Sequence, residues 1–274
     1  MTTPRNWFDS GGADYARFRP GYPRALAEHL LALRRTDGAV VDLGCGSGQL
    51  TTLLADTAAT TGDEASTVLG VDPSVAQLAD ASRHPRVRYV CGAAERLPLA
   101  TGSVGLLAAA QAAHWFEPAA FHAEVRRVCV PGGVLALVTY GVPTLDAPTH
   151  APGADAGAQA PSAGADADEV FRSWYRDELA PFWPPERRHV DSGYRTLDFP
   201  YEELPDPGLR TVAELTLDDF LGYLSTWSAV RRASETGHRG VLDRVVPRLA
   251  AAWPEGGRLR VSWPLTVRAG VVAG

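Results

Sequence analysis

The sequence predicts an α/β fold in which a mostly parallel sheet carries helices on both faces. An unbroken, β-branched run at 40–43 passes into a glycine turn at 44–48 and then into helical spacing. Further short apolar runs alternate with amphipathic segments as far as residue 140, which is the pattern of repeated strand–helix–strand units. With 274 residues, 45% of them hydrophobic, the chain can bury a substantial core.

Composition narrows the class of protein. The formal charge of -6 and the pI near 5.6 disfavour a nucleic-acid partner or an anionic membrane surface, because both usually need a basic footprint. All 26 basic residues are arginine, which indicates GC-rich coding and carries little chemical information. Three cysteines form no closed disulfide set, and neither a signal core nor a membrane-spanning run is found, so we expect a cytoplasmic protein. The oligomeric state is not indicated.

The glycine turn has the spacing GxGxG. A dinucleotide fingerprint needs GxGxxG, but Gln49 stands where its third glycine would be, and a Walker loop needs a lysine that the chain lacks. Glycines at such a turn let the backbone approach a nucleotide, since a Cβ at Gly44 or Gly46 would occupy the ligand's space. A tight turn in an ordinary α/β domain is the alternative.

The run Asp42-Leu-Gly-Cys-Gly-Ser-Gly-Gln resembles the first motif of class I S-adenosylmethionine (SAM)-dependent methyltransferases. The resemblance implies a Rossmann-like sheet of seven strands, the last one antiparallel, with helices on both faces and an inserted cap. It also implies that Gly44, Cys45, Gly46 and Gln49 line the methionine part of SAM, and that Asp42 faces its ammonium group.

An aromatic and arginine-rich segment precedes the first predicted helix, at 24–33. It resembles the YxxxRPxYP pattern of a subgroup that includes trans-aconitate methyltransferases, with Tyr15, Arg19 and Tyr22 at the matching positions. There the segment covers the cofactor, which implies that Tyr15 contacts SAM, that Arg19 pairs with its carboxylate and that Tyr22 reaches the substrate. An arginine suits a carboxylate because its planar fork donates two hydrogen bonds. Capping of a helix, or simple solvation, is the alternative for Arg19.

The second strand, predicted at 67–71, ends in Asp72-Pro73. An acidic residue at this strand end holds ribose hydroxyls in nucleotide-binding sheets, so we expect Asp72 and Pro73 at a cofactor's nucleoside. Dehydrogenases use the same position, and an aspartate here could instead cap a helix.

A helix at 74–83 and a third strand at 87–91 lead to the loop Gly92-Ala93-Ala94-Glu95. This loop resembles the methyltransferase element that borders the adenine. The resemblance implies backbone contacts from Ala94 and an acceptor for the adenine amine from Glu95.

The fourth strand, at 105–110, ends in Gln111-Ala-Ala-His-Trp-Phe, a sequence similar to that of the same small-molecule subgroup. This end borders the crevice beside the first strand, which places Gln111 at the cofactor and Trp115 at the substrate. His114 is the candidate catalytic base, because its ordinary pKa is near neutrality; a purely structural or cofactor-lining role is the alternative. A helix at 121–129 and a fifth strand at 134–140 follow.

The second half divides by composition. We predict four parts: a SAM-binding core at 1–145, a flexible Ala/Gly/Pro-rich insertion at 146–168, a cap and substrate segment at 169–207, and the end of the sheet with a helical elaboration at 208–274. The last part contains a strand at 211–215, a capping box that opens the helix at 217–229, and a final strand at 258–271.

Aromatic residues of the second half could form a substrate wall, which would include Trp183, Tyr223 and Trp227. The alternative is that they are the cap's own core. If arginines 187, 188, 231 or 232 face the ligand instead, a carboxylate acceptor is favoured.

The predicted activity is therefore SAM-dependent methylation of a small molecule, in specialised (natural-product) metabolism, on a carboxylate or hydroxyl oxygen. No metal site is expected. The alternatives are carbon methylation of an electron-rich ring such as an indole and, from another class, a non-catalytic SAM-binding module or an NAD-dependent reductase.

Overall fold

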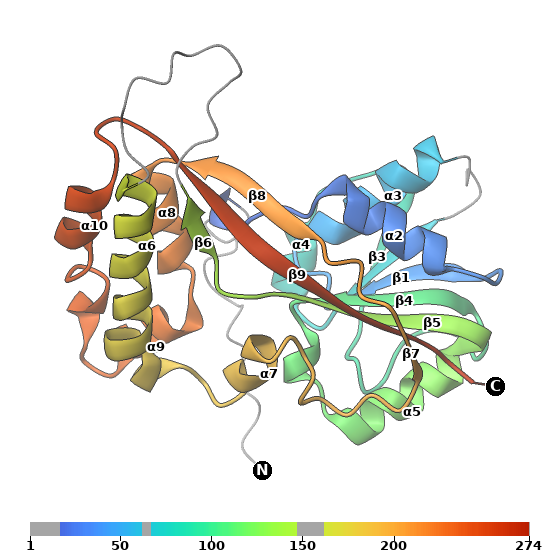
Figure 1. The fold of residues 1–274 in the computed structure, drawn as a ribbon. Coiled ribbons are helices and arrows are strands. Elements are labelled where there is room, and N and C mark those ends of the chain that lie inside the picture. The colour runs from blue at the N-terminus through green and yellow to red at the C-terminus, as the bar shows by residue number, and fades with distance from the viewer. Residues whose placement is uncertain (1–16, 62–66, 147–161, 274) are drawn as a thin grey trace.

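The computed structural model describes residues 17–61, 67–146 and 162–273. Its nine strands run in the order β3-β2-β1-β4-β5-β9-β6, and β7 and β8 also pair with β9. Strands β1 to β5 are parallel, and β9 is antiparallel to β5 (Figure 1). The strands are β1 (Ala39–Leu43), β2 (Val68–Asp72), β3 (Val87–Cys91), β4 (Val104–Ala110), β5 (Cys129–Tyr140), β6 (Thr144–Asp146), β7 (Glu202–Leu204), β8 (Arg210–Leu215) and β9 (Leu259–Val271).

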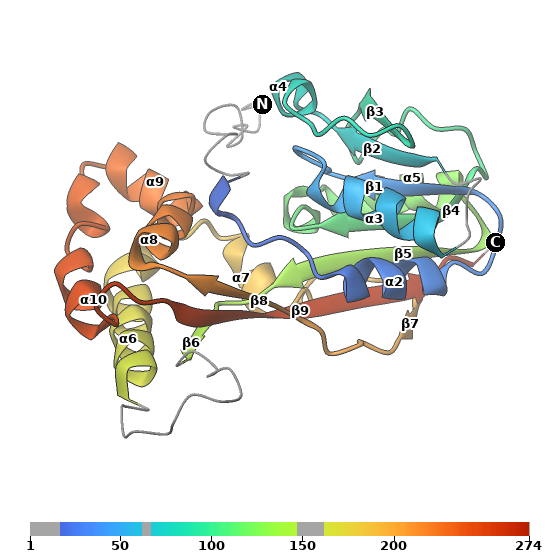
Figure 2. The same ribbon diagram turned by 90° about the horizontal axis from the view of Figure 1, so that it is seen from above.

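Helices cover both faces of the parallel strands, as the alternating pattern predicts. In Figure 1, α2 (Arg24–Leu33) and α3 (Gln49–Thr60) lie on one face and α5 (Pro118–Val128) lies on the other; Figure 2 views the face that α2 and α3 cover. Strand β4 is buried along its whole length because both faces are covered, which explains its continuous apolar sequence. The short helix α4 (Val75–Ala79) follows β2.

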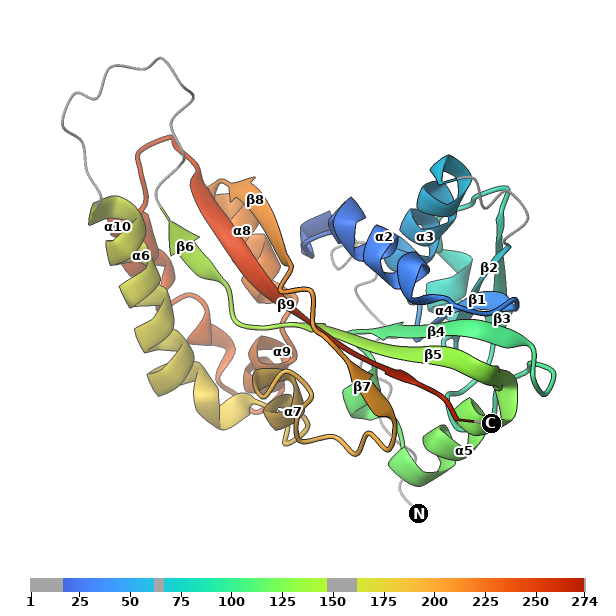
Figure 3. The same ribbon diagram turned by 45° about the vertical axis from the view of Figure 1, so that its right-hand side comes forward.

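The expected fold class is confirmed, but the sheet has nine strands rather than seven. The reason is the length of β9: its residues 265–271 pair with β5 and 269–271 with β7, while its earlier residues pair with β6 and β8. Figure 3 shows β9 crossing from the parallel strands to a group of helices. One strand thus joins the two parts of the molecule.

That helical group consists of α6 (Ser162–Ser173), α8 (Leu217–Ser225), α9 (Ser228–Glu235) and α10 (Val246–Ala252). The prediction of an irregular insertion up to residue 168 is wrong for 162–168, which form the first turns of α6. Ala167 is buried there, and the Asp168 carboxylate accepts from the Leu145 backbone N–H at 3.0 Å and pairs with Arg172. Residues 147–161 lie outside the described part.

Several short helical segments lie between these elements. They are a π-helical turn (Trp174–Leu179), a 3-10 turn (Ala180–Phe182), α7 (Arg187–Asp191) and, after α9, a 3-10 turn (Arg239–Val241). A further 3-10 turn (Ala113–Trp115) follows β4. No described helix is long and apolar enough to cross a bilayer.

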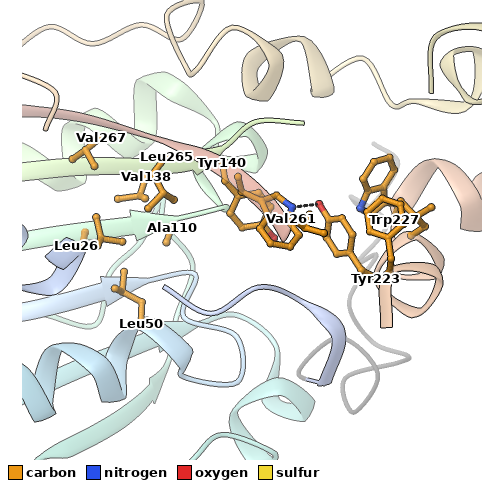
Figure 4. Packing of buried hydrophobic residues seen from close by; sticks show 14 of the residues in the cluster. Leu26, Leu50, Ala110, Val138, Tyr140, Tyr223, Trp227, Val261, Leu265 and Val267 are labelled. Carbon is orange, nitrogen blue, oxygen red and sulfur yellow. Dashed lines mark hydrogen bonds between the residues drawn. The ribbon is translucent and has the colours of Figure 1, made fainter. Parts of the chain in front are cut away.

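One buried cluster runs from α2 and α3 across the sheet to the helical group (Figure 4). Leu26, Leu50 and Val138 lie at the sheet end of this cluster, and Tyr223 and Trp227 lie at the helical end. Trp263 of β9 donates a hydrogen bond from Nε1 to the Tyr223 hydroxyl at 3.0 Å. The helical group is therefore packed on the sheet through a continuous core.

Candidate functional site

A cavity of about 470 Å³ opens at the carboxyl ends of β1, β2 and β4. Three acidic side chains, Asp42, Asp72 and Glu95, line it, and no basic side chain of the described residues does. The rest of its wall is Tyr22, Leu43, Gly44, Cys45, Gly46, Ser47, Gln49, Leu50, Pro73, Gln77, Ala93, Ala94, Ala110, Gln111, Ala112, Trp115 and Phe116. The size suits a nucleoside-sized ligand, and the charge favours a cation over a pyrophosphate.

The glycine turn supplies the floor of this cavity. Gly46 has a left-handed φ of 53°, and a Cβ built there meets only the Gln77 side chain, at 3.7 Å, so it would project into open space. Gly44 differs: a Cβ there would lie 2.5 Å from the Cβ of Ala112. The reason given for glycine from the sequence is thus wrong for Gly44, which is required by protein packing, and fits Gly46.

Asp72 lines the cavity and also forms a hydrogen bond with the glycine turn. Its Oδ2 accepts from the Gly46 backbone N–H at 2.9 Å and its Oδ1 from the Ser74 N–H at 2.8 Å. Ser74, not Asp72, caps helix α4, because its side chain accepts from Gln77 N–H. Burial raises the Asp72 pKa, and the two hydrogen bonds oppose this shift. Each carboxylate oxygen keeps a second lone pair for a ligand hydroxyl.

Asp42 is the more deeply buried carboxyl, with 1% of its surface exposed. Its pKa is raised to about 7, chiefly by burial and also by the nearby charge of Asp72. The hydrogen bond from the Thr51 hydroxyl, 2.6 Å from Oδ2, opposes this shift. A carboxyl poised near neutrality would ionise readily beside a positively charged group.

Gln111 stands at the end of β4, where the large cavity meets a second one. Its backbone has a left-handed φ of 56°, which is unusual for a residue with a side chain. Its Oε1 accepts from the Thr139 hydroxyl at 3.3 Å, but its buried Nε2 has no hydrogen-bond partner among the described residues. Such a donor is costly to bury and indicates a ligand acceptor nearby.

The second cavity has a volume of about 60 Å³, which is room for about two waters at ~30 Å³ each. It shares Gln111 and Trp115 with the first cavity, so the two adjoin. Within the described residues its wall contains no acidic side chain; it consists of Arg19, Gln111, His114, Trp115, Tyr140, Trp183, Pro184, Arg187, Val190, Trp227, Ser228 and Arg231.

Nitrogen donors dominate this smaller wall. Trp183 has a buried Nε1–H without a partner in the described part of the chain, and the Arg187 guanidinium lies 4.3 Å from the centre of its ring. Arg187 also pairs with Asp191 at 2.8 Å, which holds it in place. Donors without acceptors, together with three guanidinium groups, favour an anionic occupant.

His114 faces the same small cavity. Its Nδ1 lies 2.9 Å from the Tyr194 hydroxyl. Burial, together with the positive charges of Arg187, His189 and Arg19, lowers its pKa to about 3. The imidazole is therefore neutral at ordinary pH and is a weak proton acceptor, which argues against the predicted role as a general base.

A protein of Anaeromyxobacter dehalogenans with a solved structure, named there as a type II methyltransferase, is 43% identical to this chain. The match covers 93% of this chain and 99% of the other, with a TM-score of 0.77. The chain belongs to the class I SAM-dependent methyltransferases.

Other relatives agree with this membership. A family model described as "Methyltransferase domain" matches residues 41–137 of this methyltransferase. A protein of Dictyostelium discoideum named as a methyltransferase is 28% identical over 258 residues, which are 92% of this chain and 89% of that one. An uncharacterised methyltransferase of Mycobacterium tuberculosis is 40% identical over 135 residues, about half of each chain. The NAD-dependent reductase considered from the sequence is set aside.

Most of the predicted cofactor residues of the methyltransferase line the larger cavity. This holds for Asp42, Gly44, Cys45, Gly46, Gln49, Asp72, Pro73, Ala94, Glu95 and Gln111. Glu95 also accepts a hydrogen bond from the Glu117 backbone N–H at 2.9 Å, so part of its role is to fix the loop after β4. Tyr15 lies outside the described residues.

The other predicted site residues are divided between the two cavities. Arg19 lines the smaller cavity rather than the larger one, and donates to Tyr140 at 2.9 Å and to the Thr226 hydroxyl at 2.9 Å. Tyr22, predicted at the substrate, lines the larger cavity, whereas Trp115, Trp183 and Trp227 do line the smaller one.

Tyr223 corrects a prediction. It is 2% exposed, belongs to the core and lines neither cavity. Its hydroxyl accepts a hydrogen bond from Nε1 of Trp263. The alternative reading of the aromatic residues, as the core of the cap, is right for Tyr223.

Sequence reasoning missed several wall residues. Gln77 and Phe116 border the larger cavity, and Tyr140 and Ser228 border the smaller. Phe116 directly follows a motif already recognised, so its position was a usable signal, whereas Tyr140 and Ser228 come from distant elements with no local signature. Among the described residues no three His, Cys, Asp or Glu side chains are grouped as a metal site.

Proposed function

We propose that this methyltransferase binds SAM in the larger cavity and transfers a methyl group to the oxygen of a small carboxylate in the smaller one. The observation that carries the proposal is the contrast between two adjoining cavities. One is lined by carboxyls and the other by guanidinium and N–H donors, with Gln111 and Trp115 common to both. A cationic donor and an anionic acceptor match that contrast.

The residues of the larger cavity fit SAM. Asp42 would face its ammonium group, Asp72 its ribose hydroxyls, and Gly46 leaves the space for the methionine part. The buried Nε2–H of Gln111 offers a donor for an acceptor oxygen of either ligand. When bound, SAM would supply an activated methyl group on its sulfonium.

The chain's own contribution would be alignment and exclusion of water. A carboxylate is already a nucleophile, so no base has to remove a proton, and this agrees with the lowered pKa of His114. The rings of Trp115, Trp183 and Trp227 would cover the acceptor, and Arg187 would orient its charge. A role in specialised metabolism stays a prediction.

One experiment tests the proposal. The protein is incubated with isotopically labelled SAM and matched pairs of acceptors that differ only in a carboxylate or its primary alcohol. We expect transfer to the carboxylate member of a pair, with S-adenosylhomocysteine formed in equal amount. A consistent preference for the neutral alcohols would refute the carboxylate assignment, and binding of SAM with no transfer across the panel would favour the non-catalytic module.

Arg187 provides the matched variants. Arg187→Gln removes the charge and should raise the acceptor KM about tenfold, whereas Arg187→Lys should lose less, since a charge-assisted hydrogen bond is worth roughly 1.5–3 kcal/mol. The affinity for SAM should be the same in both variants, because Arg187 does not line the larger cavity.

Carbon methylation of an electron-rich ring is the second candidate. The three tryptophans on the wall of the smaller cavity favour it, because a flat ring could stack among them. Mild alkaline hydrolysis of the product decides between the two: a methyl ester releases methanol, whereas a ring-bound methyl group stays in place.

A further inference from the structure

Two described residues other than glycine have a left-handed backbone, Gln111 with a φ of 56° and Tyr194 with a φ of 63°. Both lie at the smaller cavity: Gln111 lines it, and the Tyr194 hydroxyl is 2.9 Å from Nδ1 of His114, which lines it. Such conformations are unfavourable for residues with a side chain, and they persist where the surrounding structure enforces them, often at functional sites.

The surroundings of Tyr194 do enforce its position. Its backbone N–H donates to the His189 carbonyl at 2.7 Å, and its own carbonyl accepts from Arg268 Nη1 at 2.8 Å. The same Nη1 donates to the Leu197 carbonyl at 2.9 Å, and Arg268 pairs with Glu203. The side chain is fully buried. The phenol is therefore held in one place against the imidazole.

A second tyrosine–histidine pair in the chain shows how such a contact is polarised. His122 Nδ1 lies 2.9 Å from the Tyr201 hydroxyl, and its Nε2 lies 3.1 Å from the Asp198 carbonyl oxygen. A carbonyl only accepts, so Nε2 of this ring must carry the hydrogen. In the neutral ring Nδ1 then accepts, and the Tyr201 hydroxyl donates to it.

His114 has the same Nδ1 contact, but among the described residues no hydrogen bond is formed by its Nε2, and the ring lines the smaller cavity. We propose that Tyr194 is a positioning residue that donates its hydroxyl hydrogen to Nδ1 of His114, so that the ring presents Nε2–H to the anion in the smaller cavity. This rests on the proposed function in one respect, the negative charge of the acceptor. His114 then acts as a hydrogen-bond donor that binds the acceptor.

The charged groups around the ring keep it neutral, and the contact with Tyr194 decides which nitrogen carries the hydrogen. Arg187 and His189 of α7 and Arg19 before α2 all act against a second proton on His114. The neutral imidazole carries one N–H hydrogen, on either Nδ1 or Nε2. If Tyr194 donates to Nδ1, that hydrogen is on Nε2, beside the guanidinium groups that would share the same anion.

The direct test is nitrogen NMR of the whole protein labelled with ¹⁵N-histidine, at pH 7 with S-adenosylhomocysteine. The His114 signals are assigned by their loss in His114→Gln. We expect a neutral ring with the hydrogen on Nε2, as for His122. Tyr194→Phe should shift the His114 signals toward the other tautomer and leave His122 unchanged. Tyr201→Phe is the matched control: it should leave the His114 signals unchanged and keep the hydrogen of His122 on Nε2, because the Asp198 carbonyl still accepts from it.

A His114 ring that carries its hydrogen on Nδ1, or is doubly protonated, would overturn the inference, as would His114 signals that Tyr194→Phe does not change. The first two outcomes are observed in the wild-type protein, with the His114 signals assigned as above, so they do not depend on the folding of Tyr194→Phe. None of these measurements needs methyl transfer. Failure to find a carboxylate acceptor would therefore refute the proposed function without deciding the tautomer of His114, which the NMR spectra test separately.

Kinetics separate the donor from a base. His114→Gln keeps an N–H donor without a basic nitrogen, and should retain activity within about tenfold, with the loss in acceptor KM. Tyr194→Phe should raise that KM about fivefold and leave kcat nearly unchanged. Loss of turnover in His114→Gln, with normal acceptor binding, would instead assign the base role.

Discussion

At the scale of single residues, burial decides which ionisable groups of the site carry charge. Asp42 and His114 are both deeply buried, and both are shifted toward their neutral forms: the carboxyl pKa rises to about 7 and the imidazole pKa falls to about 3. A bound cation would restore the charge of Asp42. His114 lies among positive groups, so its neutral form is favoured throughout the ordinary pH range.

Asp72 gives the first prediction. Asp72→Ala should weaken SAM binding by at least about tenfold, because it removes acceptors for ribose hydroxyls and for the Gly46 N–H. Calorimetry measures the affinity, and Ser74→Ala is the control, since it removes the cap of α4 and keeps the carboxylate. Unchanged affinity in Asp72→Ala would remove the ribose assignment.

Asp42 should make cofactor affinity depend on pH. Its pKa of about 7 in the free protein is above its unfolded value of 3.8, so binding of an ammonium group must expel a proton at lower pH. Affinity for S-adenosylhomocysteine should therefore increase from about pH 5.5 to about pH 7.5, with proton release detected by calorimetry in two buffers.

The same shift has a consequence for stability, with the opposite sign. Between pH 3.8 and about 7 the folded state binds more protons at Asp42 than the unfolded state, so this residue's contribution to stability falls as pH rises.

The variant Asp42→Asn tests the pH dependence of cofactor binding, which it should abolish between pH 5.5 and 7.5. A dependence that survives the substitution would assign the proton to another group.

At the scale of elements, the site is made by turns at the carboxyl ends of parallel strands. The turns after β1, β2 and β4 meet because the strands are neighbours in the order β2-β1-β4, the point at which the direction of connection reverses. The turn after β1 is fixed by hydrogen bonds from Gly44 and Cys45 N–H to the Val71 carbonyl, at 2.7 and 3.1 Å. Its shape is therefore set before any ligand binds.

Gly46→Ala tests this element against a matched control. Gly46 and Gly102 both have left-handed φ angles, 53° and 62°, so alanine should cost each about 1–2 kcal/mol of stability. A Cβ at Gly102 meets nothing within 4 Å and is remote from the cavity, whereas one at Gly46 points into it. Only Gly46→Ala should weaken SAM binding; equal affinities would show that the ligand does not contact this turn.

At the scale of the whole molecule, β9 decides where the smaller cavity lies. Its residues 265–271 complete the sheet, and its residues 259–264 carry β6, β8 and the helical group. The smaller cavity draws its wall from both parts, with Gln111 and His114 from the sheet and Trp227 and Arg231 from the helices. The relative placement of the two parts therefore fixes the cavity.

Tyr223→Phe tests that coupling. It leaves the buried Nε1–H of Trp263 without an acceptor, which should lower the free energy of unfolding by about 1–3 kcal/mol in a urea titration. The acceptor KM should change less than about twofold, because Tyr223 lines neither cavity. Tyr175→Phe, whose hydroxyl bonds Asp191 at 3.3 Å near the surface, is the milder control. A large rise in the acceptor KM without loss of stability would show instead that Tyr223 contacts the substrate.

The sequence by itself determined the parallel core and most of the lining of the larger cavity. Asp42, Gly46 and Asp72 belong to short local motifs, and their positions follow from strand ends that are adjacent in the sheet. Local sequence is enough there because a strand, its turn and its helix are set by neighbouring residues and by hydrophobic period.

Only the tertiary structure decided the smaller cavity. It placed Arg19 beside Arg187 and Arg231, buried Tyr223 in the core, and brought Tyr194 to His114 across 80 positions of the chain. These contacts depend on how the helical group packs against β9, and on a shift in His114's pKa caused by burial and by charges from other elements. Neither packing between distant segments nor the desolvation it causes leaves a local pattern in the sequence.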